Sequence, residues 1–196
     1  MPENIEIIKI VIHGRGGMGA VTACEIIAEA AYLSGNYVDV HAYPSFGAER
    51  RGAPVQAYAK LSRSEKIWDR AQIKNPDIII IFDESVLNQQ IASSLNKEGI
   101  FIINSEKDPD FFKNQFKLRD SNKIIVADIN KLSIEKDATI DGNPVVNTPI
   151  LGLLSKALPD LSLENLGKII NKRMSEKIAK LNVELIEEGY RLAKMS

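Results

Sequence analysis

The chain is poor in the residues that build metal centres. Its 196 residues include one cysteine, Cys24, and two histidines, His13 and His41. An iron–sulfur cluster needs several thiolates, and a structural zinc site needs four Cys or His ligands. We therefore expect no metal site and no resident cluster in this chain alone. Cys24 shares one face of a predicted helix with apolar residues, so we expect it in the core.

An excess of charge and long apolar runs are also missing. The formal net charge is -1 at pH 7, so no overall field attracts nucleic acid or an anionic membrane. No apolar run reaches the length of a membrane span. The first four residues lack the positive segment of a signal peptide. We expect a cytoplasmic globular protein with neither nucleic acid nor membrane among its partners.

Catalytic motifs are absent as well. The sequence contains no G-x-S-x-G, no H-x-x-x-H and no G-x-x-x-x-G-K-[ST]. We therefore expect no catalytic residue in this chain, which points to a binding or subunit role for whatever site it carries.

The most informative stretch that is present is a glycine loop. Gly14, Gly16 and Gly19 match G-x-G-x-x-G, after the apolar run 5–12 and before the helical pattern 20–33. Such glycines let the backbone turn and approach a partner closely, while the following helix directs free N–H groups at an anion. A tight turn without a ligand is the alternative. Arg15 inside the loop suits an anion.

A second unusual loop follows the next predicted strand. Residues 44–54 read Pro-Ser-Phe-Gly-Ala-Glu-Arg-Arg-Gly-Ala-Pro and contain the adjacent Arg50 and Arg51. Arginine offers forked donors to phosphate or carboxylate. We expect this loop to converge with the glycine loop at one edge of the sheet and to form a partner surface, because ligands of open α/β sheets bind there.

The pattern of elements predicts a three-layer α/β/α Rossmann-like domain with a mostly parallel sheet. We expect strands at 5–12, 37–40, 55–61, 78–82, 100–103 and 123–127, and the third of them can run antiparallel. Helices are expected at 20–33, 86–95, 109–114, 129–137, 148–157, 163–172 and 175–194. We interpret residues 1–196 as one domain whose part 158–196 is a helical C-terminal extension, either packed on the sheet or protruding as a docking arm.

Several polar residues at predicted strand ends have two interpretations. Asp83 can act chemically or cap the next helix, a role for which Ser85 competes. Asn104 has the same two interpretations, and Asn147 most plausibly caps a helix. We expect the only tryptophan, Trp68, to pack rather than to form a ligand platform.

Three blocks together resemble a known family. They are residues 14–23, residues 44–54 and the Asn75-Pro76-Asp77 turn before an apolar strand, and the likeness continues through 99–104 and 147–152. The chain is similar to the gamma subunit of 2-oxoacid:ferredoxin oxidoreductases, most of all the pyruvate (pyruvate synthase) type. The likeness covers nearly the whole chain.

The resemblance implies one piece of a larger enzyme. Such complexes oxidatively decarboxylate a 2-oxoacid with coenzyme A and pass electrons to ferredoxin. It implies alpha, beta and delta subunits as partners, with ferredoxin reached indirectly. Thiamine diphosphate and [4Fe–4S] clusters then belong to the sister subunits. The isolated chain is expected to be inactive and able to homodimerise.

A sharper hypothesis concerns coenzyme A. We expect its phosphates, or another subunit, to meet the two loops, with these cofactor-binding residues: Gly14, Arg15, Gly16, Gly17, Gly19, Arg50 and Arg51. The family usually carries glutamine where Met18 stands, so a polar contact at that position is lost or altered here.

Two rival functions stay open at the level of sequence. One is the gamma subunit of a branched-chain or other 2-oxoacid enzyme. The other is a stand-alone NAD-dependent oxidoreductase, in which Asp39 would be the acid expected at the tip of the second strand to hold the ribose.

Overall fold

A seven-stranded mixed sheet forms the centre of the molecule. The computed structural model describes residues 6–45 and 51–196. Strands β1, β4, β5 and β6 run parallel, while β3 lies antiparallel between β1 and β2, and β9 is antiparallel to β6. The strand order is β2 (Asp39–Pro44), β3 (Pro54–Ser62), β1 (Ile7–Arg15), β4 (Ile78–Ile81), β5 (Ile100–Asn104), β6 (Lys123–Ala127) and β9 (Lys194–Met195).

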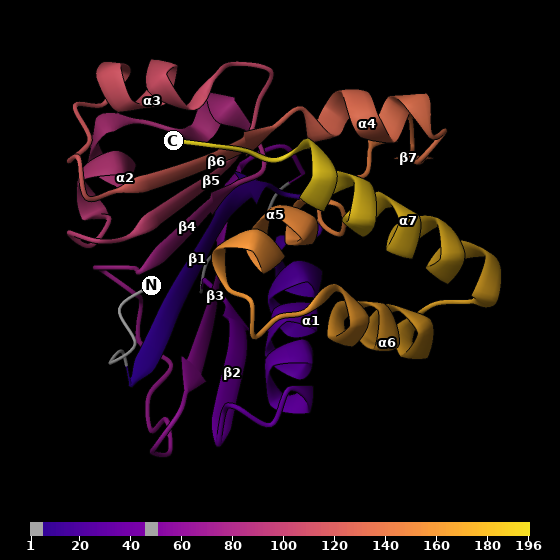
Figure 1. Ribbon diagram of the computed structural model, residues 1–196, viewed down its shortest axis with the longest axis horizontal. Coiled ribbons are helices and arrows are strands. Elements are labelled where there is room, and N and C mark those ends of the chain that lie inside the picture. Colours follow the sequence, from indigo (N-terminus) through magenta and orange to yellow (C-terminus); the bar gives the residue numbers. More distant parts are fainter. Residues whose placement is uncertain (1–5, 46–50) are drawn as a thin grey trace.

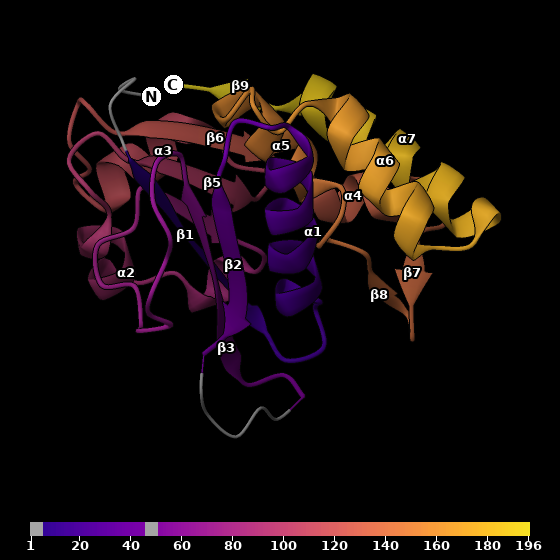
Figure 2. The same ribbon diagram turned by 90° about the horizontal axis from the view of Figure 1, so that it is seen from below.

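Helices cover both faces of this sheet (Figure 1). Figure 2 shows one layer formed by α2 and α3, and the opposite layer formed by α1 and the C-terminal helices. The short hairpin of β7 (Thr139–Ile140) and β8 (Asn143–Pro144) extends beyond the body of the molecule next to α4 (Figure 2). The helices are α1 (Ala20–Leu33), α2 (Gln89–Ser94), α3 (Pro109–Gln115), α4 (Ile129–Glu135), α5 (Ile150–Ala157), α6 (Leu163–Arg173) and α7 (Glu176–Leu192). The predicted three-layer α/β fold is confirmed.

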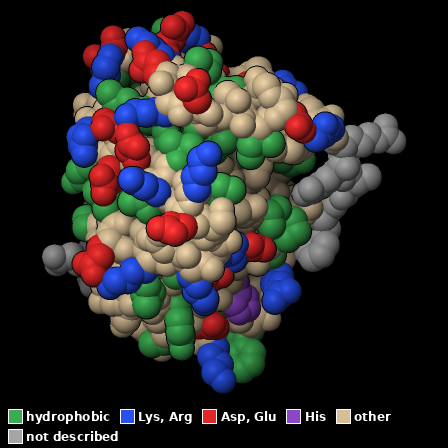
Figure 3. All heavy atoms as spheres, turned by 90° about the vertical axis from the view of Figure 1, so that its right-hand side faces the viewer, with side chains coloured by type: hydrophobic (Ala, Val, Ile, Leu, Met, Phe, Trp, Pro, Cys, Tyr) green, Lys and Arg blue, Asp and Glu red, His purple; other side chains and the backbone are tan. Residues whose placement is uncertain are grey.

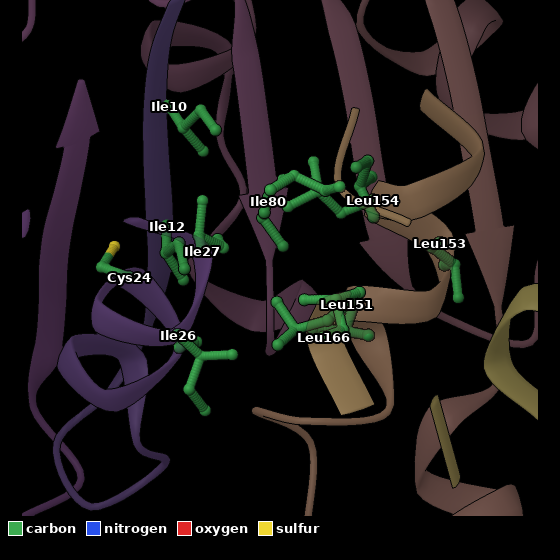
Figure 4. Packing of buried hydrophobic residues seen from close by; sticks show 14 of the residues in the cluster. Ile10, Ile12, Cys24, Ile26, Ile27, Ile80, Leu151, Leu153, Leu154 and Leu166 are labelled. Atoms are coloured by element: carbon green, nitrogen blue, oxygen red, sulfur yellow. The ribbon is translucent and has the colours of Figure 1, made fainter. Parts of the chain in front are cut away.

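The larger core lies between the sheet and α1, α5 and α6 (Figure 4). Ile10 and Ile12 of β1 point into it, because alternate residues of a strand face the same side. Cys24 is fully buried in this cluster, and burial raises the pKa of its thiol. The predicted core position of Cys24 is confirmed. Val11 and His13, in the odd register of β1, face the other side of the sheet.

The C-terminal helices pack on the body of the molecule. Helices α5 and α7 approach so closely that a Cβ on Gly152 would lie 2.1 Å from the carbonyl oxygen of Ile186. Arg173 of α6 pairs with Glu25 and Glu29 of α1 at 2.9 and 2.6 Å. The C-terminal helical part therefore packs on the sheet, as one of the two expectations had it, and does not protrude as a docking arm. The side that carries α6 and α7 mixes basic and acidic side chains (Figure 3).

Strand boundaries differ from the prediction in two places that affect the site. Strand β1 continues through Gly14 to Arg15, because β3 pairs with it as far as the Arg15–Pro54 pair. Strand β2 was expected at 37–40 but runs from Asp39 to Pro44. Strand β9 was not foreseen, since only its pairing with β6 makes two residues at the chain end a strand.

Other predictions fail for local reasons. The expected helix 86–95 is a 3-10 turn, η1 (Glu84–Val86), followed by the short α2, because Asp83 caps the first and Asn88 the second. Trp68 is 86% exposed, so the expectation that it packs is wrong, while its neighbour Ile67 is buried. A turn at Asp141-Gly142 links β7 (Thr139–Ile140) to β8 (Asn143–Pro144) in a short hairpin. Among residues 6–45 and 51–196, no helix has the length and apolar character of a membrane span.

Candidate functional site

A cleft of about 1400 Å³ opens at the carboxyl ends of the parallel strands. The glycine loop after β1, the turns after β4, β5 and β6, helix α4 and the β7–β8 hairpin all contribute to its wall. This is the edge at which ligands of α/β sheets bind. Its lining includes Arg15, Gly16, Gly17, Met18, Gly19, Arg51, Asp83, Glu84, Asn104, Asp128, Lys131, Ile134, Ile140, Asp141 and Asn147.

The glycine loop brings the N-terminus of α1 to the cleft. Gly17 and Gly19 have φ of 95° and 77°, a backbone region that favours glycine. A Cβ on Gly19 would lie 2.5 Å from Nδ2 of Asn147. Gly19 caps α1 without a side-chain hydrogen bond, and the first turn holds no acidic residue. The positive end of this helix therefore faces the cleft without a counter-charge from its own turn.

The two loops of the sequence prediction meet in the structure. The N–H of Gly16 donates to the carbonyl of Ala53 at 2.9 Å, and the N–H of Gly52 donates to the carbonyl of Gly16 at 3.1 Å. The predicted convergence is confirmed for Arg51, which lines the cleft beside Gly16 and Gly17. Arg50 lies outside the described residues. Gly14 does not line the cleft, because it packs in β1 against Phe82.

Arg15 is held on three sides by its own chain. Its Nε donates to Asp83 at 2.7 Å, one terminal nitrogen donates to the carbonyl of Gly52 at 2.9 Å, and the other to the hydroxyl of Ser85 at 2.6 Å. These contacts join the glycine loop, the arginine loop and the turn after β4. We call Arg15, Asp83, Ser85 and Gly52 the arginine clamp.

Asp83 is ionised within this clamp. Burial acts to raise the pKa of Asp83, but hydrogen bonds from Ser85 and from Arg15, together with the charge of Arg15, outweigh it and hold the pKa below its ordinary value. Asp83 also caps η1 by accepting from the N–H of Ser85 at 2.9 Å. The capping interpretation is therefore right, and Ser85 is not the cap.

Two asparagines at the cleft stabilise turns. Asn104, at the end of β5, accepts from the N–H of Ile129 at 2.9 Å and donates to the carbonyl of Phe82 at 2.9 Å. It thereby ties β4, β5 and the start of α4 together. Asn147 accepts from the N–H of Thr148 at 3.0 Å and packs against Gly19. Both side chains position backbone around the cleft.

Met18 turns back into its own loop. Its sulfur accepts from the N–H of Arg15 at 3.3 Å, and its side chain packs on the larger core. A thioether is a weak acceptor, so this hydrogen bond is weaker than one to an amide oxygen. The loop keeps its shape here through the backbone hydrogen bonds of Gly16 and the clamp.

Sequence reasoning missed the far wall of the cleft. Glu84, Asp128 and Lys131 reach it because the turns after β4 and β6 end at the same edge as β1. The rule that parallel strands share a carboxyl edge is the signal that could have found them. Among residues 6–45 and 51–196, six carboxylates and three cations line the cleft, and the cations Arg15 and Arg51 lie at the glycine-loop end. They are Asp83, Glu84, Glu106, Asp128, Glu135 and Asp141 against Arg15, Arg51 and Lys131.

Two further expectations concern ligands of the chain. Within residues 6–45 and 51–196, no group of three His, Cys, Asp or Glu side chains is placed to hold a metal ion. Asp39 begins β2, whereas the tip of β2 at the carboxyl edge is Pro44. β3 also separates β2 from β1. The acid that a dinucleotide site needs beside the glycine loop is therefore not supplied by Asp39.

Comparison with known proteins matches the chain over residues 9–192 to the family described as pyruvate ferredoxin/flavodoxin oxidoreductase. The pyruvate/ketoisovalerate oxidoreductases common subunit gamma of Pyrococcus furiosus is 37% identical over 93% of this chain and 95% of its own length. The pyruvate synthase subunit PorC of Methanothermobacter marburgensis is 36% identical over 96% of this chain and 99% of its own.

A solved structure has the same fold. The crystal structure of the pyruvate oxidoreductase subunit PORC from Thermotoga maritima superimposes with a TM-score of 0.82 at 31% identity, over 98% of this chain and 99% of that one. The family and the subunit type that the sequence motifs predicted are confirmed. This chain belongs to the pyruvate ferredoxin/flavodoxin oxidoreductase family and is a subunit of the gamma, or PorC, type.

Proposed function

We propose that this chain is the gamma subunit of a pyruvate:ferredoxin oxidoreductase and that its cleft forms one wall of a composite site. The complex would convert pyruvate and coenzyme A to acetyl-CoA, carbon dioxide and reduced ferredoxin. The observation that carries the proposal is the meeting of the two loops at the carboxyl edge, beside a helix N-terminus with no acidic residue in its first turn. The relatives named pyruvate synthase subunit PorC support the assignment.

A second candidate function differs from the first in the 2-oxoacid that the complex oxidises. Relatives from Pyrococcus furiosus and Thermococcus litoralis are each named as a common gamma subunit of pyruvate and ketoisovalerate oxidoreductases. A shared subunit implies that other chains select the 2-oxoacid. A role in a branched-chain enzyme is therefore the alternative for this chain, and the same cleft serves in either case.

The redox and thiamine chemistry is assigned to other subunits of the complex. The only cysteine, Cys24, is fully buried in the core, so it offers no thiolate to an iron–sulfur cluster. We propose that alpha, beta and delta subunits hold thiamine diphosphate and the [4Fe–4S] clusters, and that ferredoxin contacts those subunits. This chain then contributes binding surface and no redox group.

The glycine-loop end of the cleft fits the phosphates of coenzyme A. Gly17 leaves open space above the loop, where an added Cβ would meet only the side chain of Arg51 at 3.7 Å. The donors there are the first N–H groups of α1 and the exposed guanidinium of Arg51, which pairs with the exposed Asp141 at 3.0 Å. Three nitrogens of Arg15 already donate hydrogen bonds within the clamp, so Arg15 positions the loop rather than holding a phosphate. Coenzyme A, when bound, supplies the thiol that accepts the acyl group.

The mouth of the cleft fits contact with another chain. Ile134 of α4 and Ile140 of the hairpin line the cleft and are 58% and 68% exposed. Exposed apolar side chains beside a polar cleft are typical of an interaction surface. The six carboxylates that line the described part of the cleft repel a polyanion, so the chain alone should bind coenzyme A weakly. Cations of a partner subunit would complete the site.

The test uses the assembled oxidoreductase with Arg51→Ala and, separately, Arg50→Ala. An exposed charge-assisted hydrogen bond contributes about 1 kcal/mol, so we expect the KM for coenzyme A to rise about fivefold with little change in kcat. Arg191→Ala is the matched control, because Arg191 is an exposed, ion-paired arginine on α7. It should leave the KM unchanged.

The outcomes separate the rival functions. An unchanged KM for coenzyme A together with unchanged assembly, in both loop variants, would reject the proposed contact and the proposed interface. Tight binding of NAD by the isolated chain would favour the dehydrogenase alternative. Loss of turnover on removal of this chain from the complex distinguishes a working subunit from a passive attachment.

A further inference from the structure

The two halves of one sheet face have different covers. Helices α2 and α3 pack on β4, β5 and β6 (Figure 2). Over β1, β3 and β2 the cover is the irregular segment 63–77, which connects β3 to β4. Its buried side chain Ile73 packs there on Val11, Tyr43 and Tyr58. A partner that approaches this half of the face therefore meets the exposed side chains of a segment without regular secondary structure.

Trp68 lies near the middle of this segment. It is 86% exposed, more than any other large apolar side chain in the described part of the chain. Burial of an indole against a partner is favourable because it removes a large apolar area from water. Tryptophan and arginine are also enriched at the centres of protein interfaces. Trp68 differs from an isolated exposed side chain in two respects, which are its fixed backbone and its charged neighbours.

The backbone is fixed on both sides of Trp68. Before it, the N–H of Ile67 donates to Oδ2 of Asp39 at 2.7 Å, and the side chain of Ile67 is buried. After it, Nζ of the buried Lys60 donates to Oδ1 of Asp69 at 2.6 Å and to its carbonyl oxygen at 3.3 Å. These contacts tie the segment to β2 and β3. A segment that is already ordered loses little conformational entropy when it docks on a partner.

The exposed charge beside the indole is mainly positive, although the whole chain has a formal net charge of -1. Lys66 and Arg70 lie two residues to either side and are exposed, and neither forms an ion pair with a residue in 6–45 or 51–196. The hydrogen bond from Lys60 holds the pKa of Asp69 below its ordinary value, and this ion pair neutralises the carboxylate. Glu65 is the other acidic residue of the segment. Carboxylates on a partner would complement the two exposed cations.

We propose that Trp68 docks into an apolar pocket on another subunit of the oxidoreductase, and that carboxylates around this pocket contact Lys66 and Arg70. We call these three residues the tryptophan surface. The proposal rests on the role of this chain as the gamma subunit of such a complex. The hydrogen bond of Ile67 to Asp39 places this surface at the start of β2, whereas the cleft lies at the carboxyl edge of the sheet. The tryptophan surface is therefore separate from the proposed contact with coenzyme A.

Hydroxyl-radical footprinting compares this surface with a second exposed aromatic side chain. Trp68 is the only tryptophan of the chain, and Tyr32 on α1 is 65% exposed in the opposite layer. Mass spectrometry gives the oxidation rate of each side chain in the free chain and in the assembled oxidoreductase. We expect assembly to slow oxidation of Trp68 on the order of tenfold and that of Tyr32 by less than about twofold.

Substitutions separate the indole from the charges. The measured quantity is the affinity of this chain for a complex of the other subunits at several salt concentrations. Trp68→Ala should weaken binding on the order of thirtyfold, which is typical of a truncated interface anchor. Lys66→Glu and Arg70→Glu should each weaken it about tenfold, and the effect should shrink as the salt concentration rises.

Two exposed side chains of the opposite layer are the matched controls. Tyr32→Ala removes an exposed aromatic ring, and Lys177→Glu reverses an exposed charge on α7. Both should leave the affinity within about twofold of that of the wild type.

Protection of Trp68 that is no greater than that of Tyr32 would overturn the proposal, and so would an unchanged affinity of Trp68→Ala. Unchanged affinities of both glutamate variants would show that the partner surface is not acidic. Protection of Trp68 in the free chain as its concentration rises would mean that a second copy of this chain is the occupant, and would also overturn the proposal. The KM for coenzyme A in the Arg51→Ala enzyme is measured separately, so failure here and failure of the proposed function are distinguishable.

Discussion

Two arginines of the cleft have opposite environments. Arg15 lies on the inner wall, which we define as the glycine loop and the arginine clamp, and Arg51 lies on the exposed rim. On the inner wall, Arg15 is half-buried and makes three hydrogen bonds within the clamp. On the rim, Arg51 is 86% exposed in its side chain, and its one ion pair within the described part of the chain is with Asp141 at 3.0 Å. The same residue type therefore builds the loop in one place and is available to a ligand or partner in the other.

The difference follows from what surrounds each guanidinium. The clamp joins three segments that are distant in sequence, so each hydrogen bond of Arg15 also fixes backbone. The pair of Arg51 with Asp141 lies in solvent, where an ion pair contributes little to stability. Arg15 on the wall therefore contributes mainly to stability and Arg51 on the rim to recognition, and three sets of variants test this division.

The largest expected loss of stability comes from a substitution at Gly19, in the turn that leads from the inner wall of the cleft into α1. Gly19→Ala adds a Cβ at a φ of 77° and at 2.5 Å from the amide of Asn147. We expect the free energy of unfolding to fall by about 2–3 kcal/mol, from backbone strain and crowding together. Urea denaturation measures it.

Gly35→Ala is the matched control for this turn. Gly35 has nearly the same φ, 75°, but an added Cβ there meets nothing within 4 Å. We expect the free energy of unfolding of Gly35→Ala to fall by about 1 kcal/mol, from backbone strain alone. Equal losses in the two variants would show that the contact of Gly19 with Asn147 contributes nothing to the wall.

The next effect concerns the two arginines themselves. Arg15→Ala leaves the half-buried Asp83 without its cation, and we expect a loss of about 2 kcal/mol in unfolding free energy. Arg51→Ala should cost about 0.5 kcal/mol or less. Thermal and urea unfolding of both variants give the ranking, and a reversed order would contradict the division into wall and rim.

The smallest effect is the response of the clamp to acid. The pKa of Asp83 is held below its ordinary value in the folded chain, so the unfolded state takes up this proton first as pH falls. The contribution of the clamp is therefore full above the ordinary carboxyl pKa and is lost as pH falls through the lowered value.

Asp83→Asn provides the measurement for this acid effect. The difference in unfolding free energy between wild type and variant should stay constant from pH 7 to about pH 5 and shrink below about pH 4. A difference that does not change with pH over this range would mean that the ionised carboxylate of Asp83 does not stabilise the fold.

Much of the architecture could be predicted because it is local. The helix 20–33 and the strand 123–127 coincide with α1 and β6, since an apolar period and clear flanking signals define them. The helix after β4 was mispredicted because two capping residues, Asp83 and Asn88, divide it. Only the hydrogen bonds of these side chains decide between one helix and two turns.

The site was predicted at its near wall and missed at its far wall. Arg15, Gly16 and Arg51 were grouped correctly because each lies in a loop that was predicted to follow one of the first two strands. Glu84 and Asp128 come from turns that are distant in sequence and carry no motif. Their place in the cleft depends on the strand order, which a single sequence does not display.

The sequence by itself determined the family, the glycine turn and the apolar strands, because local chemistry and period are enough for these features. Tertiary structure alone decided that Arg15 rather than Arg51 is engaged in the wall of the cleft, and that Asp39 lies away from the glycine loop. The physical reason is the insertion of β3 between β2 and β1. Strand pairing of this kind joins residues through space, and no pattern along the chain encodes which side chains then meet.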